Sequence, residues 1–77
     1  MTKTLYACMK NGTDSLLRVV SILRRKEFDV RNITMESKQN TGVSALFITI
    51  DEKSNLGIAQ AIKIMNKLTD ISEIKEI

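Results

Sequence analysis

The order of its hydrophobic patterns is the feature that most constrains how this 77-residue chain can fold. Residues 4–9 alternate as a strand does, and after a polar turn an amphipathic helical stripe begins at Leu16. Strand patterns at 30–36 and 43–50 come next, then a second helical stripe, and the tail at 71–77 is assigned as an edge strand. This βαββαβ order predicts an α+β, ferredoxin-like plait: a four-stranded antiparallel sheet with two helices on one face.

Both predicted helices have one apolar side and follow a turn or capping residue. The first stripe is Leu16, Val19, Val20 and Leu23, and the second is Ile58, Ala61, Ile62, Met65 and Leu68. A turn at Asn11-Gly12 precedes the first helix. Thr13 or Asp14 is predicted to cap that helix by accepting a backbone N–H, and Ser54 is predicted to cap the second.

The length predicts one domain, residues 1–77, with no internal boundary. A domain this small buries only roughly 60–65% of its unfolded surface, so at least a homodimer is expected. The net charge of +3 arises from 12 basic and 9 acidic residues spread along the chain, a distribution that argues against nucleic-acid binding.

A single cysteine and the absence of histidine exclude an internal disulfide and a zinc site. No signal peptide and no stretch of about 20 apolar residues is present, which predicts a cytoplasmic protein without a membrane anchor. Without histidine, a metal cluster or a phosphate loop, a catalytic role has no residues to carry it. We therefore expect no catalytic residues and no enzyme activity of its own.

Four side chains are predicted to share the sheet face opposite the helices: Tyr6, Cys8, Ala45 and Phe47. Scattered surface apolar groups are ordinary, but clustering on adjacent central strands favours an interface. Aromatic residues at Tyr6 and Phe47 are also compatible with an RNA recognition motif. The third strand lacks the several aromatics typical of that motif, so RNA binding is the weaker alternative.

Several short motifs occur in a fixed order along the chain. They are Asn11 in the first loop, Leu16-Leu17-Arg18-Val19 at the start of the first helix, Phe28-Asp29-Val30 at the second strand, and Asn66-Lys67-Leu68-Thr69-Asp70-Ile71. Their order and spacing resemble an ACT domain and, more narrowly, the small regulatory subunit of acetolactate synthase (acetohydroxyacid synthase) in its short form. The resemblance covers essentially the whole chain.

The resemblance implies domains that pair side by side into a continuous sheet and bind an amino-acid effector at the subunit interface. The matching effector residues are Asn11, Gly12, Asp14 and Ser15 in the first loop, with Asp29 and Val30 at the second strand. Free N–H groups at a helix N-terminus suit a carboxylate. The implied effector is valine or another branched-chain amino acid.

Asp14 departs from the family, which usually has Gly at that place. A carboxylate there repels an effector's carboxylate, so weak or absent valine feedback is expected. The implied role is to bind and activate the catalytic subunit in branched-chain amino-acid biosynthesis. The thiamine diphosphate, FAD and Mg²⁺ of that reaction are expected in the catalytic partner, with no cofactor in this chain. The alternative is a stand-alone amino-acid sensor acting on another enzyme or a transporter.

Overall fold

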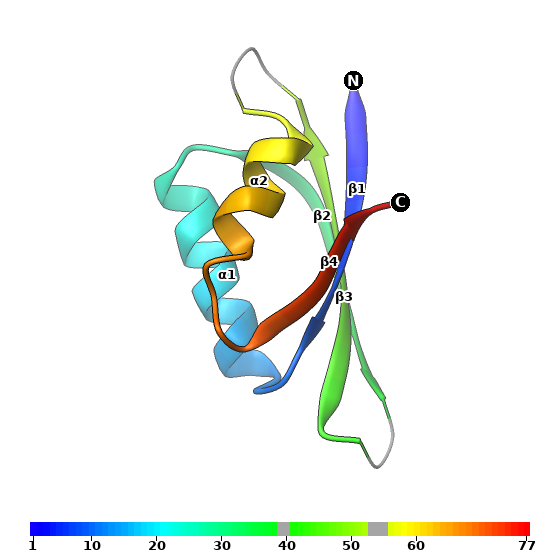
Figure 1. The fold of residues 1–77 in the computed structure, drawn as a ribbon. Helices are drawn as coiled ribbons and strands as arrows, with labels where there is room; N and C mark the ends of the chain where they lie inside the picture. The colour runs from blue at the N-terminus through cyan, green and yellow to red at the C-terminus, as the bar shows by residue number, and fades with distance from the viewer. Residues whose placement is uncertain (39–40, 53–55) are drawn as a thin grey trace.

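The computed structural model describes residues 1–38, 41–52 and 56–77. Its elements are β1 (Thr2–Met9), α1 (Thr13–Arg25), β2 (Asp29–Lys38), β3 (Val43–Asp51), α2 (Ile58–Met65) and β4 (Ile71–Glu76). The predicted βαββαβ order is confirmed, and both helices cover the same face of one sheet (Figure 1).

The sheet has the strand order β2-β3-β1-β4, and each neighbouring pair is antiparallel. β1 and β3 are therefore the central strands, while β2 and β4 are the edges. Between the central strands, Leu5 lies opposite Ile48 and Tyr6 opposite Phe47. Because side chains alternate along a strand, this register sends one set toward the helices and the other to the open face.

The core lies between the sheet and the two helices. β1 and β3 supply fully buried side chains from alternate positions, namely Leu5, Ala7, Met9, Leu46, Ile48 and Ile50. The helices cover them with Val19, Leu23, Ile58, Ala61 and Met65. Leu16, Val20 and Ile62, also in the predicted stripes, are only partly buried, so each stripe is narrower than its pattern predicted.

The predicted cap of α1 is wrong. Gly12 occupies the N-cap position with φ 51°, and this residue has no side chain with which to cap the helix. Because helical geometry already begins at Thr13, the side chains of Thr13 and Asp14 lie too far into the first turn to act as caps. The side-chain oxygen of Ser15 instead accepts the backbone N–H of Asn11 at 3.3 Å.

Helix α2 begins later than its predicted cap. Ser54 lies outside the described residues, and the N-cap position belongs to Gly57. Gln60 accepts the N–H of Gly57 at 3.2 Å, and Glu52 accepts the N–H of Ile58 at 3.0 Å. The side chains of Gln60 and Glu52 thus accept the first free backbone N–H groups at the start of this helix.

The tail forms edge strand β4, as predicted, and contains a bulge. Cys8 pairs with Ser72, whereas Tyr6 pairs with Lys75, so two residues of β4 lie opposite Ala7. Glu73 adopts φ 51° there. The extra residue lets Ile71 and Ile74 both pack toward the core, although they stand three positions apart.

Candidate functional site

The loop between β1 and α1 is held by a buried carboxylate from the residue just before β4. Asp70 is 7% exposed. Its carboxylate accepts Ser15 Oγ at 2.6 Å and Asn11 Nδ2 at 3.4 Å. Arg18 Nη1 donates to both carboxylate oxygens, at 3.0 and 2.9 Å. The loop, α1 and β4 therefore meet at one side chain.

The electrostatics of this cluster favour an ionised Asp70. The hydrogen bond from Ser15 is the main cause that lowers the pKa of its carboxyl below the usual value of 3.8, against the opposing effect of burial. Asn11 and the positive charge of Arg18 lower this pKa further. At neutral pH the cluster thus contains a carboxylate with three side-chain donors.

Two other predicted effector residues lie beside this cluster. Gly12 has open space where a Cβ would stand, so its glycine is required by the positive φ rather than by crowding. Asp14 is exposed in the first turn of α1, where its negative charge favours the positive helix end. A ligand approaching this end of α1 therefore meets the charge of Asp14.

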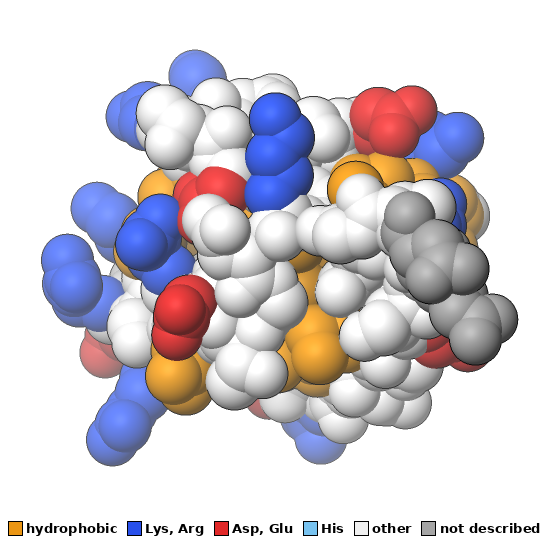
Figure 2. Space-filling view, turned by 90° about the horizontal axis from the view of Figure 1, so that it is seen from below, with side chains coloured by type: hydrophobic (Ala, Val, Ile, Leu, Met, Phe, Trp, Pro, Cys, Tyr) orange, Lys and Arg blue, Asp and Glu red, His pale blue; other side chains and the backbone are white. Residues whose placement is uncertain are grey.

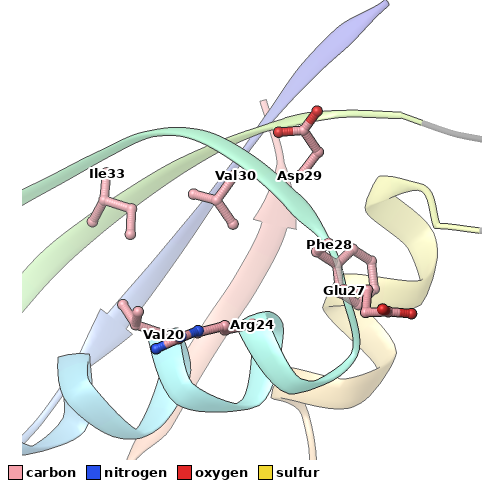
Figure 3. Close-up of a pocket in the computed structure, with 7 residues that line it drawn as sticks. All are labelled: Val20, Arg24, Glu27, Phe28, Asp29, Val30 and Ile33. Carbon is pink, nitrogen blue, oxygen red and sulfur yellow. The ribbon is translucent and has the colours of Figure 1, made fainter.

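Asp29 and Val30 lie in a groove at the other end of α1. The groove has a volume of about 490 Å³ and is lined by Val20, Arg24, Glu27, Phe28, Asp29, Val30 and Ile33. Figure 3 shows Val30 and Ile33 directed from β2 toward α1, whereas the carboxylate of Asp29 points away. That carboxylate pairs with Arg31 at 3.0 Å.

The six predicted effector residues therefore form two groups, one at each end of α1. A helix of 13 residues is about 20 Å long. A molecule the size of an amino acid cannot touch both groups within one chain. Sequence reasoning also missed Asp70 and Arg18 as partners of the loop, although both lie in motifs on which the resemblance rests.

The open sheet face contains the four predicted interface residues. The rings of Tyr6 and Phe47 are 5.3 Å apart and tilted by 60°. Cys8 and Ala45 are almost fully buried by their neighbours, at 4% and 5% exposure. Tyr6 and Phe47 are half-buried, so they offer a partner more surface than the other two.

Polar side chains connect the strands across this open face. Lys38 Nζ donates to Tyr6 Oη at 3.5 Å, and Tyr6 Oη lies 3.1 Å from Cys8 Sγ. Cys8 Sγ donates to Glu73 Oε2 at 3.2 Å. The contact with Cys8, together with burial, raises the pKa of the Tyr6 hydroxyl above its usual value, while Lys38 lowers it.

The surface charge is dispersed. Figure 2 views the end of the molecule that includes the β1–α1 loop, and its Lys and Arg side chains are spread around the periphery among acidic ones. Within residues 1–38, 41–52 and 56–77, no group of three or more His, Cys, Asp or Glu side chains could hold a metal ion. Nor is any described helix long and apolar enough to cross a membrane.

The sequence matches a known protein family over most of its length. The model of the ACT domain family matches residues 11–74, so the chain belongs to the ACT domain family. A probable acetolactate synthase small subunit from Archaeoglobus fulgidus is 26% identical over 77 residues, covering 100% of this chain and 48% of that protein.

Solved structures share the fold. The acetolactate synthase small subunit of Thermotoga maritima superposes with a TM-score of 0.84 at 20% identity, covering 99% of this chain and 47% of that one. The ACT domain of GTP pyrophosphokinase from Chlorobium tepidum superposes with a TM-score of 0.80 at 9% identity, covering 100% of this chain and 97% of that domain. The chain thus spans about half the length of the two small subunits.

Proposed function

We propose that this protein is a non-catalytic regulatory subunit of acetolactate synthase. The observation that carries the proposal is the similarity to a probable small subunit of that enzyme along all 77 residues. In this proposal, residues 1–77 act as one ACT domain that binds and activates the catalytic subunit in branched-chain amino-acid biosynthesis. Thiamine diphosphate, FAD and Mg²⁺ belong to that partner.

A side-by-side dimer would complete the effector site. β2 is an edge strand, and an unpaired edge is a template for another strand. Antiparallel pairing of β2 with its copy about a two-fold axis would set the loop of one chain, with Asn11 and Ser15, near Asp29 and Val30 of the other. The apolar part of the groove, with Val20, would be covered in the same step.

The effector of this site is valine or another branched-chain amino acid. Its carboxylate would approach the N-terminal end of α1, where backbone N–H groups favour negative charge. The exposed carboxylate of Asp14 stands at this end and opposes that approach. Feedback by valine is therefore weak or absent.

The open face, with Tyr6 and Phe47 as its most accessible predicted contacts, is proposed to take part in the assembly with the catalytic subunit. Activation requires that this contact be stronger in the active arrangement of the catalytic subunit than in the inactive one, because a partner shifts an equilibrium only by its differential affinity.

The direct test is an acetolactate synthase assay of a cognate catalytic subunit, with and without this protein, across a valine titration. Activation that valine leaves unchanged supports an activating subunit with a blocked effector loop. Activation that valine reverses supports the role in the complex but contradicts the block by Asp14. If the protein neither activates the catalytic subunit nor co-purifies with it, the proposal is rejected in favour of a stand-alone amino-acid sensor.

A further inference from the structure

The cluster around Asp70 has the chemistry of an occupied carboxylate site. Within it, a guanidinium, a hydroxyl and a side-chain amide donate to one carboxylate, which is the donor set that proteins use for small carboxylates. Here the carboxylate belongs to the same chain. Asp70 is nine-tenths buried, whereas Arg18 stays half exposed, so the guanidinium reaches inward from the surface.

We propose that Asn11, Ser15 and Arg18 form a carboxylate-binding site that the chain fills with its own Asp70, and that this internal ligand fixes the β1–α1 loop. A free carboxylate such as acetate or formate is accepted there only when the side chain of Asp70 is removed. This inference adds an internal ligand to the loop of the proposed effector site. It depends on the proposed function only in assigning this loop to effector control.

Backbone contacts support the fixing role. Lys10, at the start of the loop, donates its N–H to the carbonyl oxygen of Asp70 at 3.1 Å. Asn11 donates its own N–H to Ser15 Oγ, the atom that in turn donates to the Asp70 carboxylate. Both the main chain and the side chains of the loop are thus tied to one residue of the far terminus.

Competition favours the internal carboxylate over a free one. A group held on the same chain acts at an effective concentration that a dissolved ligand in the millimolar range does not match, because its position is already fixed. Asn11 and Ser15 were both predicted to contact an effector. Ser15 donates its one hydroxyl proton to Asp70, so an effector carboxylate beside Gly12 would be bound by the loop backbone and by the second N–H of the exposed Asn11 amide, not by Ser15.

The test is chemical rescue of an Asp70→Ala variant in the isolated protein. Thermal unfolding is followed while sodium acetate or sodium formate is added, with sodium chloride of equal ionic strength as the reference. The variant is expected to gain several degrees of Tm in a saturable manner with either carboxylate, whereas the unaltered protein shows no such gain. In the double variant Ser15→Ala/Asp70→Ala, the rescue is expected to weaken because a donor is lost.

The matched control is Asp51→Ala. Asp51 also accepts hydrogen bonds from an arginine and an ammonium group, but at the exposed end of β3. Saturable rescue of this variant, or equal effects of acetate and chloride on Asp70→Ala, would contradict a built carboxylate site.

If Asp70→Ala does not fold, Asp70→Asn keeps the size of the side chain and tests the fixing role by hydrogen exchange. The amides of Asn11 and Leu16 are expected to exchange at least tenfold faster than in the unaltered protein, with core amides of β3 unchanged. Equal exchange at the loop would overturn the proposal. Because no catalytic subunit is present in either experiment, their outcome is independent of whether the chain activates acetolactate synthase.

Discussion

The two ends of α1 differ in what they leave for another molecule. At the N-terminal end, Ser15 and Arg18 donate to the carboxylate of Asp70, so the polar groups find partners within the chain. At the C-terminal end, Val20 faces Val30 and Ile33 across an open groove. At the first end the side-chain donors are satisfied within one chain, whereas the second end is an apolar surface that gains from being covered.

This difference explains why the residues of the single predicted effector site lie in two separate groups in the structure. Residues of the first loop and residues at the start of β2 flank the same helix in sequence, and the resemblance assigned both to one effector. The helix itself keeps them about 20 Å apart. A shared ligand therefore requires a second copy of the chain, and the following predictions separate the two ends.

The largest expected effect is on stability, from Asp70→Ala. This change leaves the buried hydroxyl of Ser15, and the more exposed donors of Asn11 and Arg18, without their acceptor. The Tm should fall by about 5 °C or more, since each kcal/mol shifts the Tm of a domain this size by roughly 4–8 °C. Calorimetry of both Asp70→Ala and the control Asp51→Ala measures this fall in Tm. A smaller fall for Asp70→Ala than for Asp51→Ala would contradict a stabilising role of the cluster around Asp70.

At the groove, Val20→Asp should weaken the dimer rather than the fold. A charge inside an apolar interface costs affinity because it is desolvated on association, and we expect the dimer dissociation constant to rise tenfold or more, or about 1.4 kcal/mol. Sedimentation over a range of concentrations measures it. Ser21→Asp, at an exposed position of the same helix, is the matched control, and equal masses for both variants would exclude the groove from the dimer.

Phe47→Asp tests whether the open face is a third, separate surface. Loss of the half-buried ring should weaken assembly with the catalytic subunit by roughly tenfold while leaving the groove intact. Co-purification and sedimentation read the two effects separately. If this variant still captures the catalytic subunit and keeps its mass, the open face is not an interface.

Acid should destabilise the loop end through protonation of Asp70. Because the native pKa of Asp70 is below its unfolded value, its contribution to stability is full well above pH 4 and is lost as the pH falls through the native pKa. Urea unfolding between pH 6 and pH 2.5 should show this loss, and Asp70→Asn should flatten the curve. An unchanged slope in the variant would assign the acid sensitivity elsewhere.

The smallest expected effect is from Asp14→Gly. Removing an exposed charge should strengthen valine binding by about 1 kcal/mol or less, because water screens such charges. Calorimetric titration of valine measures this effect, with Glu76→Gly as the control, because Glu76 is an exposed carboxylate on β4, the sheet edge opposite β2. Identical heats for Asp14→Gly and the unaltered protein would mean that Asp14 does not block the site.

The fold could be predicted because the patterns that define it are local. Alternation in β3 and the helical stripes are each read within about ten residues, and their order selects the plait. The caps could not be predicted from capping residues alone: α1 begins after Gly12, which has no side chain, and α2 is capped by Glu52, which accepts the N–H of Ile58 from just beyond β3. The three-residue spacing of the isoleucines in the tail likewise results from the bulge at Glu73, which the sequence pattern does not indicate.

The candidate site could be predicted only in part, for a related reason. Asn11 and Ser15 were recognised from a motif, but their partner Asp70 lies more than fifty positions away. No pattern within the sequence pairs residues at that distance. Asp29 and Val30 are separated from the loop by the length of α1, and no pattern within the sequence shows that a second copy of the chain is needed to bring the two groups together.

The hydrogen bond between Ser15 and Asp70 also bears on how the chain folds. It joins residues 55 positions apart, and Asp70 immediately precedes β4, the strand that pairs with β1. Closing so long a segment is among the entropically costliest steps of folding. We therefore expect the loop to take its final arrangement together with the last strand, because its hydrogen bonds to Asp70 depend on where that strand lies.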